Sequence, residues 1–254
     1  SALDAYADYE QLVGGIDTLF KDSSARMQQY ASQAYQTAGV SANRYMEIST
    51  SFAASLISSL GGDTEAAADM ANTAIMDMSD NANKMGTSLE VVQEAYQSLA
   101  RGNYEMLDSL KLGYGGTKSE LERLLSDAEQ IAASQGMVRD FSVDSYSDIV
   151  EAIHLVQDEM GITGTTAAEA ATTISGSVNS MRSAWENWLA GLGNADADIS
   201  GLTDQLLDSI GTVAQNVGPR VGIIIGTLVT EIGNRGPEIA AALRDMLFDA
   251  FSHV

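Results

Sequence analysis

The chain has 254 residues, and its 13 Lys and Arg against 35 Asp and Glu give a net charge of −22. A surface this acidic repels phosphate backbones, so we expect no sequence-specific nucleic-acid partner. No cysteine is present, which excludes disulfides, zinc knuckles and thiol catalysis. The 45% of hydrophobic residues support a folded protein with one large domain or two small ones.

The hydrophobic pattern predicts an all-α protein. Only two prolines occur, and apolar residues recur at helical spacing with no convincing alternating run. We expect about ten short-to-medium helices with glycine-rich turns, forming a bundle-like core. The three clearest apolar stripes are Ile75, Met78, Ala82 and Met85; Leu121, Leu124, Leu125, Ala128, Ile131 and Ala132; and Ile149, Ile153, Val156 and Met160.

Helix boundaries are indicated by glycines and capping residues. Gly61 and Gly62 are expected to end one helix, and Asp63 or Thr64 to cap the next. Three capping boxes are predicted, each with threonine at its first position and glutamate at its fourth. They span residues 87–90, 117–120 and 166–169.

The stretch "LKLGYGGTKSELERLL", residues 110–125, combines three glycines with a lysine and a serine. A phosphate-binding Walker loop needs glycine immediately before the lysine, but Thr117 stands there, and no strand precedes the loop. The stretch is therefore predicted to end one helix at its glycines and to begin another.

Two fragments of metal sites lack the residues that would complete them. Glu151 and His154 form a Glu-x-x-His element, but a di-iron bundle needs a second element, and the only other histidine is His253. We expect no metal there and a partly buried His154. Residues 196–201, "DADISG", begin like a calcium loop, but Leu207 replaces the twelfth-position glutamate. A linker in which Asp198 or Ser200 caps the next helix is expected instead.

The chain changes character near residues 191–201. Short, sharply capped helices precede this stretch, and a longer apolar segment with spaced glycines follows it. The predicted organisation is a helical core at 1–190, a linker at 191–201 and a glycine-spaced apolar helical segment at 202–254. The chain starts without methionine and ends inside an amphipathic run, so we expect a fragment of a longer polypeptide.

Five glycines in the last segment share one face of a helix, at spacings of 7, 4, 4 and 7. They are Gly211, Gly218, Gly222, Gly226 and Gly233. Small residues at such spacing allow helix backbones to approach closely, which favours self-association. Membrane insertion is an alternative, although the uncharged run 221–230 is shorter than the roughly 20 residues that span a bilayer. A helix beginning at Gly218 is the third interpretation.

Several stretches together resemble the core region of the tail tape measure proteins of tailed bacteriophages and prophages. The resemblance covers roughly residues 5–190, and residues 191–254 share only their apolar character. Its longest and most unusual pieces are "DMSDNANKMGT" and "LKLGYGGTKSELERLL"; others are "YEQLVGGIDTLF", "AYQTAGVSANRYMEISTSFAASLISSLGGDT" and "DIVEAIHLVQDEMGITGTTAAEAATTISGSVNSMRSAW".

The resemblance implies a structural role in the virion. Tail tube subunits assemble around a tape measure protein, so its length sets the tail length, and it leaves ahead of the DNA at infection. The implied partners are the tail tube protein, distal tail and tail-tip proteins, other copies of the chain and, after ejection, the host membrane. The implied locations are the tail lumen or tip, the host cytoplasm during assembly and the host envelope on infection.

The family is not defined by catalytic residues, so none is carried over, and we expect neither an enzyme nor a cofactor. Because these helices are interrupted every 10 to 25 residues or so, we expect a compact portion near the distal end and not the measuring rod itself. The alternative is an envelope-active module. It would form a pore through residues 209–232, or it would cleave cell wall with an unrecognised carboxylate pair.

Overall fold

The computed structural model describes residues 1–232, with side chains as far as Pro219. This part of the chain is all-helical, with ten α-helices and no strand, as the hydrophobic pattern predicts. The α-helices are α1 (Ala2–Phe20), α2 (Ser24–Thr37), α3 (Ala42–Ser59), α4 (Thr64–Met85), α5 (Leu89–Ala100), α6 (Lys118–Ser134), α7 (Tyr146–Glu159), α8 (Thr165–Thr172), α9 (Ile174–Leu192) and α10 (Ile199–Ile232). Two short 3-10 helices, η1 (Lys21–Ser23) and η2 (Glu105–Leu110), complete them.

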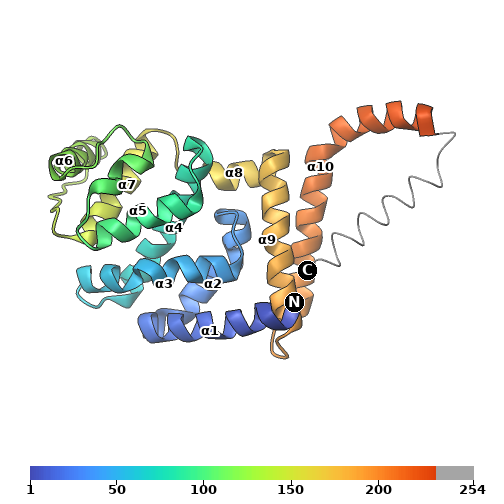
Figure 1. Cartoon of the computed structure of the whole chain (residues 1–254), viewed down its shortest axis with the longest axis horizontal. Helices are drawn as coiled ribbons and strands as arrows, with labels where there is room; N and C mark the ends of the chain where they lie inside the picture. Colours follow the sequence, from blue (N-terminus) through green and yellow to red (C-terminus); the bar gives the residue numbers. More distant parts are fainter. Residues whose placement is uncertain (233–254) are drawn as a thin grey trace.

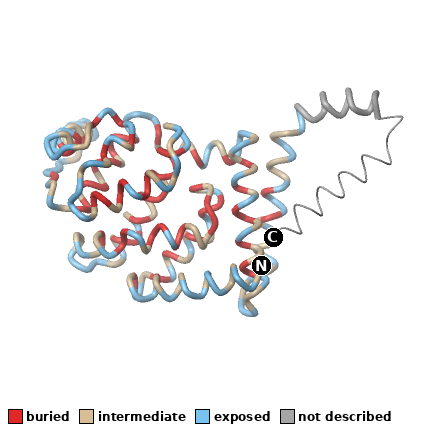
Figure 2. Tube along the Cα trace, in the orientation of Figure 1, coloured by how far each residue is buried: buried red, intermediate tan, exposed pale blue. Residues whose placement is uncertain are grey.

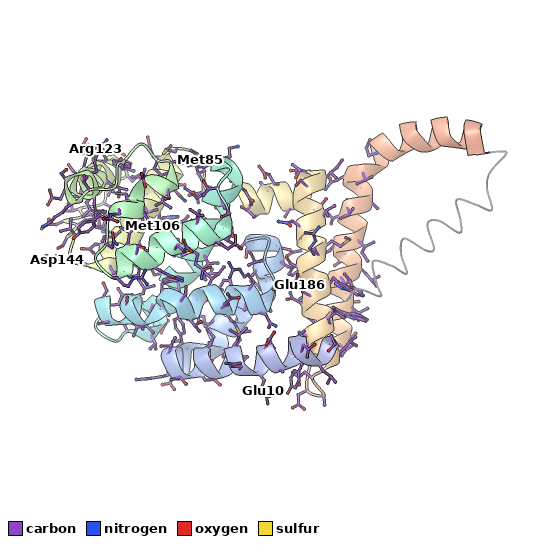
Figure 3. The ribbon with its side chains drawn as sticks, in the orientation of Figure 1. Glu10, Met85, Met106, Arg123, Asp144 and Glu186 are labelled. Carbon is purple, nitrogen blue, oxygen red and sulfur yellow. The ribbon has the colours of Figure 1, made fainter. Side chains whose placement is uncertain are left out.

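The helices form two parts (Figure 1). Helices α1 to α7 pack around one another, and we call them the body. Helices α9 and α10 run side by side along one end of the body, and we call residues 174–219 of this pair the arm. Short α8 joins the two parts, and α1 reaches across to pack against α9. Figure 3 shows Arg123 on α6 at the end of the body away from the arm, and Glu186 on α9.

The body has one continuous apolar core. All the α6 stripe is buried or packed against this core, and Ile75, Met78 and Ala82 of α4 are buried within it. The prediction was wrong for Met160, whose side chain is 48% exposed. α7 ends at Glu159, and the chain turns through Gly161 at a φ of 70°, so the stripe leaves the core one turn earlier than its spacing suggests.

The buried side chains of α9 are smaller and more polar than those of the body core. The buried residues of α9 are Ser177, Ser180, Ser183, Ala184, Asn187, Ala190 and Gly191. A separate small apolar cluster joins Tyr35 of α2 to Ala184 and Leu206 of the arm. Figure 2 shows the buried positions dense through the body and confined to one side of the arm helices.

The predicted helix starts are partly confirmed. Asp63 caps α4 by accepting the Ala66 N–H at 3.0 Å, and Thr117 caps α6 by accepting the Glu120 N–H at 3.2 Å. The box at 87–90 was wrong, because Ser88 and not Thr87 caps α5, and it does so by accepting the Val91 N–H.

The box at 166–169 was wrong, since Gly164 occupies the cap position of α8 and has no side chain to contribute. Of the predicted linker, residues 191–192 belong to α9 and 199–201 to α10, leaving 193–198 as the connection.

Candidate functional site

A run of buried polar side chains lies on α4. Asp77, Ser79, Asp80 and Asn81 are each no more than 3% exposed. Helix α4 is packed between α3, α5, α7 and α8, so these residues face neighbouring helices and not solvent. We call this group the α4 polar network. It coincides with the "DMSDNANKMGT" stretch. In no other stretch of the described residues do buried polar side chains lie so close together in the sequence.

Asp77 pairs with His154 of α7. The imidazole Nδ1 lies 2.9 Å from Oδ2 and 3.1 Å from Oδ1 of the carboxylate. Burial is the main influence on Asp77 and raises its pKa, while the hydrogen bond with His154 opposes that rise. The same hydrogen bond raises the pKa of His154, whose side chain is one-third exposed. The prediction of a partly buried histidine is confirmed.

Asp80 caps a helix that is remote from it in the sequence. Its Oδ2 accepts the Gly164 N–H at 2.8 Å and its Oδ1 accepts the Thr166 N–H at 2.9 Å. The first N–H groups of a helix have no partner within the helix and carry partial positive charge, so a carboxylate stabilises them. The carboxylate of α4 thus replaces the cap that Gly164 cannot supply, and it fixes α8 to the body.

Two carboxamides complete the network. Asn81 donates through Nδ2 to the Leu110 carbonyl at 2.9 Å and to Gln157 Oε1 at 2.8 Å. Gln157 in turn donates through Nε2 to the Asp77 carbonyl at 3.1 Å. These bonds connect α4, η2 and α7 in the interior. Buried atoms in or beside the network that lack a protein partner are Ser79 Oγ, Asn81 Oδ1, Thr87 Oγ1, Tyr96 OH and Thr163 Oγ1.

The hydrogen bonds of the network join α4 to α7, to η2 and to the start of α8. An orienting Asp–His pair is useful in catalysis when the second ring nitrogen faces a nucleophile. Among the hydrogen bonds of the described residues, His154 bonds only to Asp77. Both buried carboxylates are committed, Asp77 to the imidazole and Asp80 to the start of α8.

The two metal-site fragments have other structural roles. Glu151 forms an ion pair with Arg139, with Oε1 2.7 Å from Nε, whereas His154 is hydrogen-bonded to Asp77. The two residues of the Glu-x-x-His element therefore bind different partners. Asp198 accepts the Gly201 N–H at 2.9 Å and so caps α10. Of the two caps predicted for this loop, Asp198 and Ser200, the first is confirmed. In residues 1–219 no three His, Asp or Glu side chains are grouped to hold a metal ion.

The loop at 110–117 is held by α6. Glu120 accepts the Gly115 N–H at 3.1 Å and pairs with Arg123, and these hydrogen bonds, that from Arg123 first, lower the pKa of Glu120 to about 2. The Arg123 guanidinium lies 4.3 Å from the centroid of the Tyr114 ring. A Cβ at Gly116 would collide with the Glu105 carbonyl oxygen. The loop is a helix connection, as predicted.

The predicted glycine face lies on α10. Among the residues whose side chains are described, a Cβ at Gly211 or at Gly218 would meet nothing within 4 Å. Gly222 and Gly226 also lie in α10, whereas Gly233 lies outside the described residues. The helix runs from Ile199 to Ile232 through Pro219, so it does not begin at Gly218. None of the described helices combines the length and the apolarity needed to cross a membrane.

Sequence reasoning missed the α4 polar network, because it treats polar residues beside an apolar stripe as solvent-facing. The only feature of the sequence that pointed to the network was the unusual "DMSDNANKMGT" stretch. It was noted for its resemblance to the tape measure family and not as a set of buried polar residues. Comparisons of the chain with protein-family models, curated proteins and solved structures find no match. The function therefore has to be argued from the residues themselves.

Proposed function

We propose that this protein is a structural component of a phage tail, a folded helical portion of the tape measure protein. In this role it helps to set tail length during assembly and leaves the tail ahead of the DNA at infection. Its partners are the tail tube protein, the distal tail proteins and other copies of itself. It acts inside the virion tail after assembly in the host cytoplasm.

The observation that carries the proposal is the place of the two most distinctive stretches of the resemblance. The "DMSDNANKMGT" stretch supplies the α4 polar network, and "LKLGYGGTKSELERLL" forms the loop that α6 holds through Glu120 and Arg123. Both stretches connect helices to one another. This structural role of the two stretches agrees with the tape measure family, which is not defined by catalytic residues.

The charge of the protein also supports the proposal. Several arginines of the body form ion pairs with neighbouring acids, among them Arg26, Arg44, Arg123 and Arg139. These pairs leave a surface dominated by carboxylates on a chain of net charge −22. Such a surface does not hold phosphate backbones, so it suits a protein that shares a tube with DNA and has to leave it.

No observation specifically favours an envelope-active module over this role. The buried carboxylates Asp77 and Asp80 are bound to other protein groups, so they do not form a free acid pair in a cleft. The pore version depends on residues 209–232, which belong to α10. Leakage of a dye from liposomes on addition of the protein would support that version.

Particles released by cells that carry the gene would test the proposal. Peptides of this chain should be found in purified tails, protected from protease in intact tails and digested once the tails are opened. Deletion of the gene should abolish tails of uniform length, and a wild-type copy should restore them. Normal tails from the deletion strain, or tails that contain no peptide of this chain, would contradict the proposal.

A further inference from the structure

Two cavities lie along the junction of the body and the arm. The larger, of about 420 Å³, is lined by α1, α2, α3, α9, the 193–198 connection and the start of α10. The smaller, of about 330 Å³, lies between α1, the start of α3 and α9. Asn43 of α3 and Asn187 of α9 line both. Protein interiors are close-packed, so two cavities along one junction indicate that the arm fits the body loosely.

Residues at these cavities carry buried polar atoms that have no protein partner. Asn187 accepts the Ala42 N–H through Oδ1 at 2.7 Å, and its Nδ2 is unpaired. Asn43 Oδ1 and Gln205 Oε1 are also buried and unpaired. Such an atom destabilises the state in which it is buried, because it has given up its hydrogen bonds to water. Movement of the arm away from the body lets water reach these residues and therefore favours an open form.

One large side chain of the body is inserted into the arm. Tyr35 of α2 is 4% exposed and belongs to a small cluster of buried apolar residues with Ala184 and Leu206. All the other residues of this cluster, including the partly buried ones packed against it, lie on α9 or α10. The cluster is separate from the body core. It can therefore be broken while that core stays intact.

A single residue connects α8 to the arm. Thr173 separates α8 from α9, and its backbone is extended, with φ −112° and ψ 154°. α8 itself is fixed to the body, because Asp80 accepts the Gly164 and Thr166 N–H groups. Hinges in proteins are a few residues at the ends of elements that absorb a change of φ and ψ. Thr173 is in such a position between a fixed helix and the arm.

The two helices of the arm are attached to each other. They lie side by side (Figure 1), and Trp188 of α9 donates through Nε1 to Thr203 Oγ1 of α10 at 3.0 Å. Asn216 of α10 donates to the Ala171 and Thr173 carbonyls, at 3.2 and 3.3 Å. These last contacts lie beside Thr173, where a rotation about that residue displaces atoms least. The arm can therefore turn as one piece.

We propose that the arm is a hinged flap, which turns about Thr173 and opens the junction with the body while every helix stays folded. Tyr35 holds the closed form, and the unpaired carboxamides favour the open form. The far end of α9, about 30 Å from Thr173 at 1.5 Å per residue, moves most. In the closed form Gly193, at that end, lies against Tyr6 of α1. The inference does not depend on the tail role, since it uses only the contacts between arm and body.

One backbone amide reports on the opening. Ala42 is the first residue of α3, so its N–H has no partner within the helix, and it donates to Asn187 across the junction. The buried Thr166 N–H donates to Asp80 and does not involve the arm. Hydrogen exchange of single amides measures local opening in the folded protein. NMR-detected exchange without denaturant should therefore show Ala42 at least tenfold less protected than Thr166.

A reversible lock tests whether the arm itself moves. The chain has no cysteine, and a Cβ at Gly193 would lie 2.5 Å from the Cβ of Tyr6. Disulfides have about 3.8 Å between Cβ atoms, so a small shift allows Tyr6→Cys and Gly193→Cys to cross-link the far end of α9 to α1. In the oxidised protein the protection of Ala42 should rise at least tenfold, toward that of Thr166. Reduction of the same protein is the control and should restore the difference.

Two further variants change the balance without a cross-link. Tyr35→Ala should lower the protection of Ala42 roughly tenfold or more, the factor that corresponds to burial of one large side chain, and should leave Thr166 unchanged. Gln205→Met removes an unpaired acceptor at nearly constant volume and should raise the protection of Ala42 about fivefold. Gln36→Met, the same change at an exposed site on α2, should have no effect.

Three outcomes would overturn the proposal. The first is unchanged exchange at Ala42 in the oxidised lock, which would show that the Asn187 side chain moves without the arm. The second is an equal loss of protection at Ala42 and Thr166 in Tyr35→Ala, which would show that arm and body open together. The third is unchanged or faster exchange at Ala42 in Gln205→Met. The last two apply even if the disulfide does not form.

Discussion

In the body, helices meet through large apolar side chains, whereas the buried positions of α9 in the arm are serine, alanine, asparagine and glycine. Tyr45, Phe52 and Phe20 are among the largest fully or almost fully buried side chains, and all three belong to the body. Burying such a side chain contributes about 1.5–3 kcal/mol, and the small residues of α9 bury far less apolar area each. We therefore expect the arm to leave the body before the body unfolds.

The difference shows which contacts hold each part. The arm depends on hydrogen bonds such as that from the Ala42 N–H to Asn187, and each of these contributes only about 0.5–1.5 kcal/mol. Two optical signals separate the parts. Far-UV circular dichroism follows all helices, and most of these are in the body. Tryptophan fluorescence follows the arm alone, where the Trp185 and Trp188 rings stack with centroids 5.2 Å apart.

Truncation of a core aromatic should give the largest effect. Phe52→Ala leaves a cavity in the middle of the body core and is expected to lower the free energy of unfolding by about 3–5 kcal/mol in urea titrations. Both signals should shift, because the arm has nothing to pack against once the body is lost. Leu207→Ala, at a residue of α10 that is 59% exposed, should change the free energy of unfolding by less than about 0.5 kcal/mol. Equal effects of the two would contradict the assignment of Phe52 to the packed core and of Leu207 to the surface.

Loss of the remote cap should separate the two signals. Asp80→Ala removes the partner of the Gly164 N–H and leaves the buried Thr166 N–H unpaired, at an expected cost of about 1–3 kcal/mol. Because α8 joins the arm to the body, the fluorescence transition should move to lower urea by more than the dichroism transition. Asp63→Ala removes an exposed cap within the body, at about 0.5–2 kcal/mol, and should move both transitions together. A coincident shift in Asp80→Ala would show that Asp80 does not control the arm.

The Asp77–His154 pair predicts a smaller, pH-dependent effect. The pKa of His154 is raised on folding, so its contribution to stability is complete below the unfolded pKa near 6.5 and is lost as pH rises through the folded value. The raised pKa of Asp77 acts in the same direction at lower pH, because ionising the buried carboxyl opposes folding. The negative charges of Asp80 and Asp158 add to the rise in the pKa of Asp77, and those of Asp158 and Glu151 add to the rise in the pKa of His154.

Urea titrations of the wild type should therefore give lower stability at pH 8.5 than at pH 6. His154→Gln, which keeps a hydrogen-bond donor but does not titrate in this range, should reduce that difference. An equal pH dependence in the wild type and in His154→Gln would assign the effect to other groups and would contradict the prediction.

The body could be predicted from the sequence in most respects. Apolar spacing located the helices, and local chemistry located the cap at Thr117. For α4 and α10 it left two candidates each, of which Asp63 and Asp198 are the caps. The α4 polar network could not be predicted, because periodicity assigns polar residues to solvent and does not show that α7 and α8 cover Asp77 and Asp80. A remote cap leaves no local pattern at all.

The cavity at the junction escaped prediction for a related reason. Its lining comes from segments as distant as α1 and α10, so no window of the sequence contains it. Spacing predicted that the glycines of α10 share a face, but it could not show whether another helix of the same chain covers that face. Within residues 1–219, nothing lies against Gly211 or Gly218.

The smallest expected effect lies on that face. Gly211→Ala adds a methyl group where nothing lies within 4 Å and improves helix propensity, so it should stabilise the arm by about 0.5–1 kcal/mol in the fluorescence transition. Gly176→Ala, on α9, should do the opposite, because its Cβ would collide with the Glu169 carbonyl oxygen. If two copies pack through the glycine face, Gly211→Ala should also weaken the dimer in sedimentation equilibrium, because the methyl group keeps the backbones apart. A variant that is more stable and whose association is unchanged would remove Gly211 from any self-association surface.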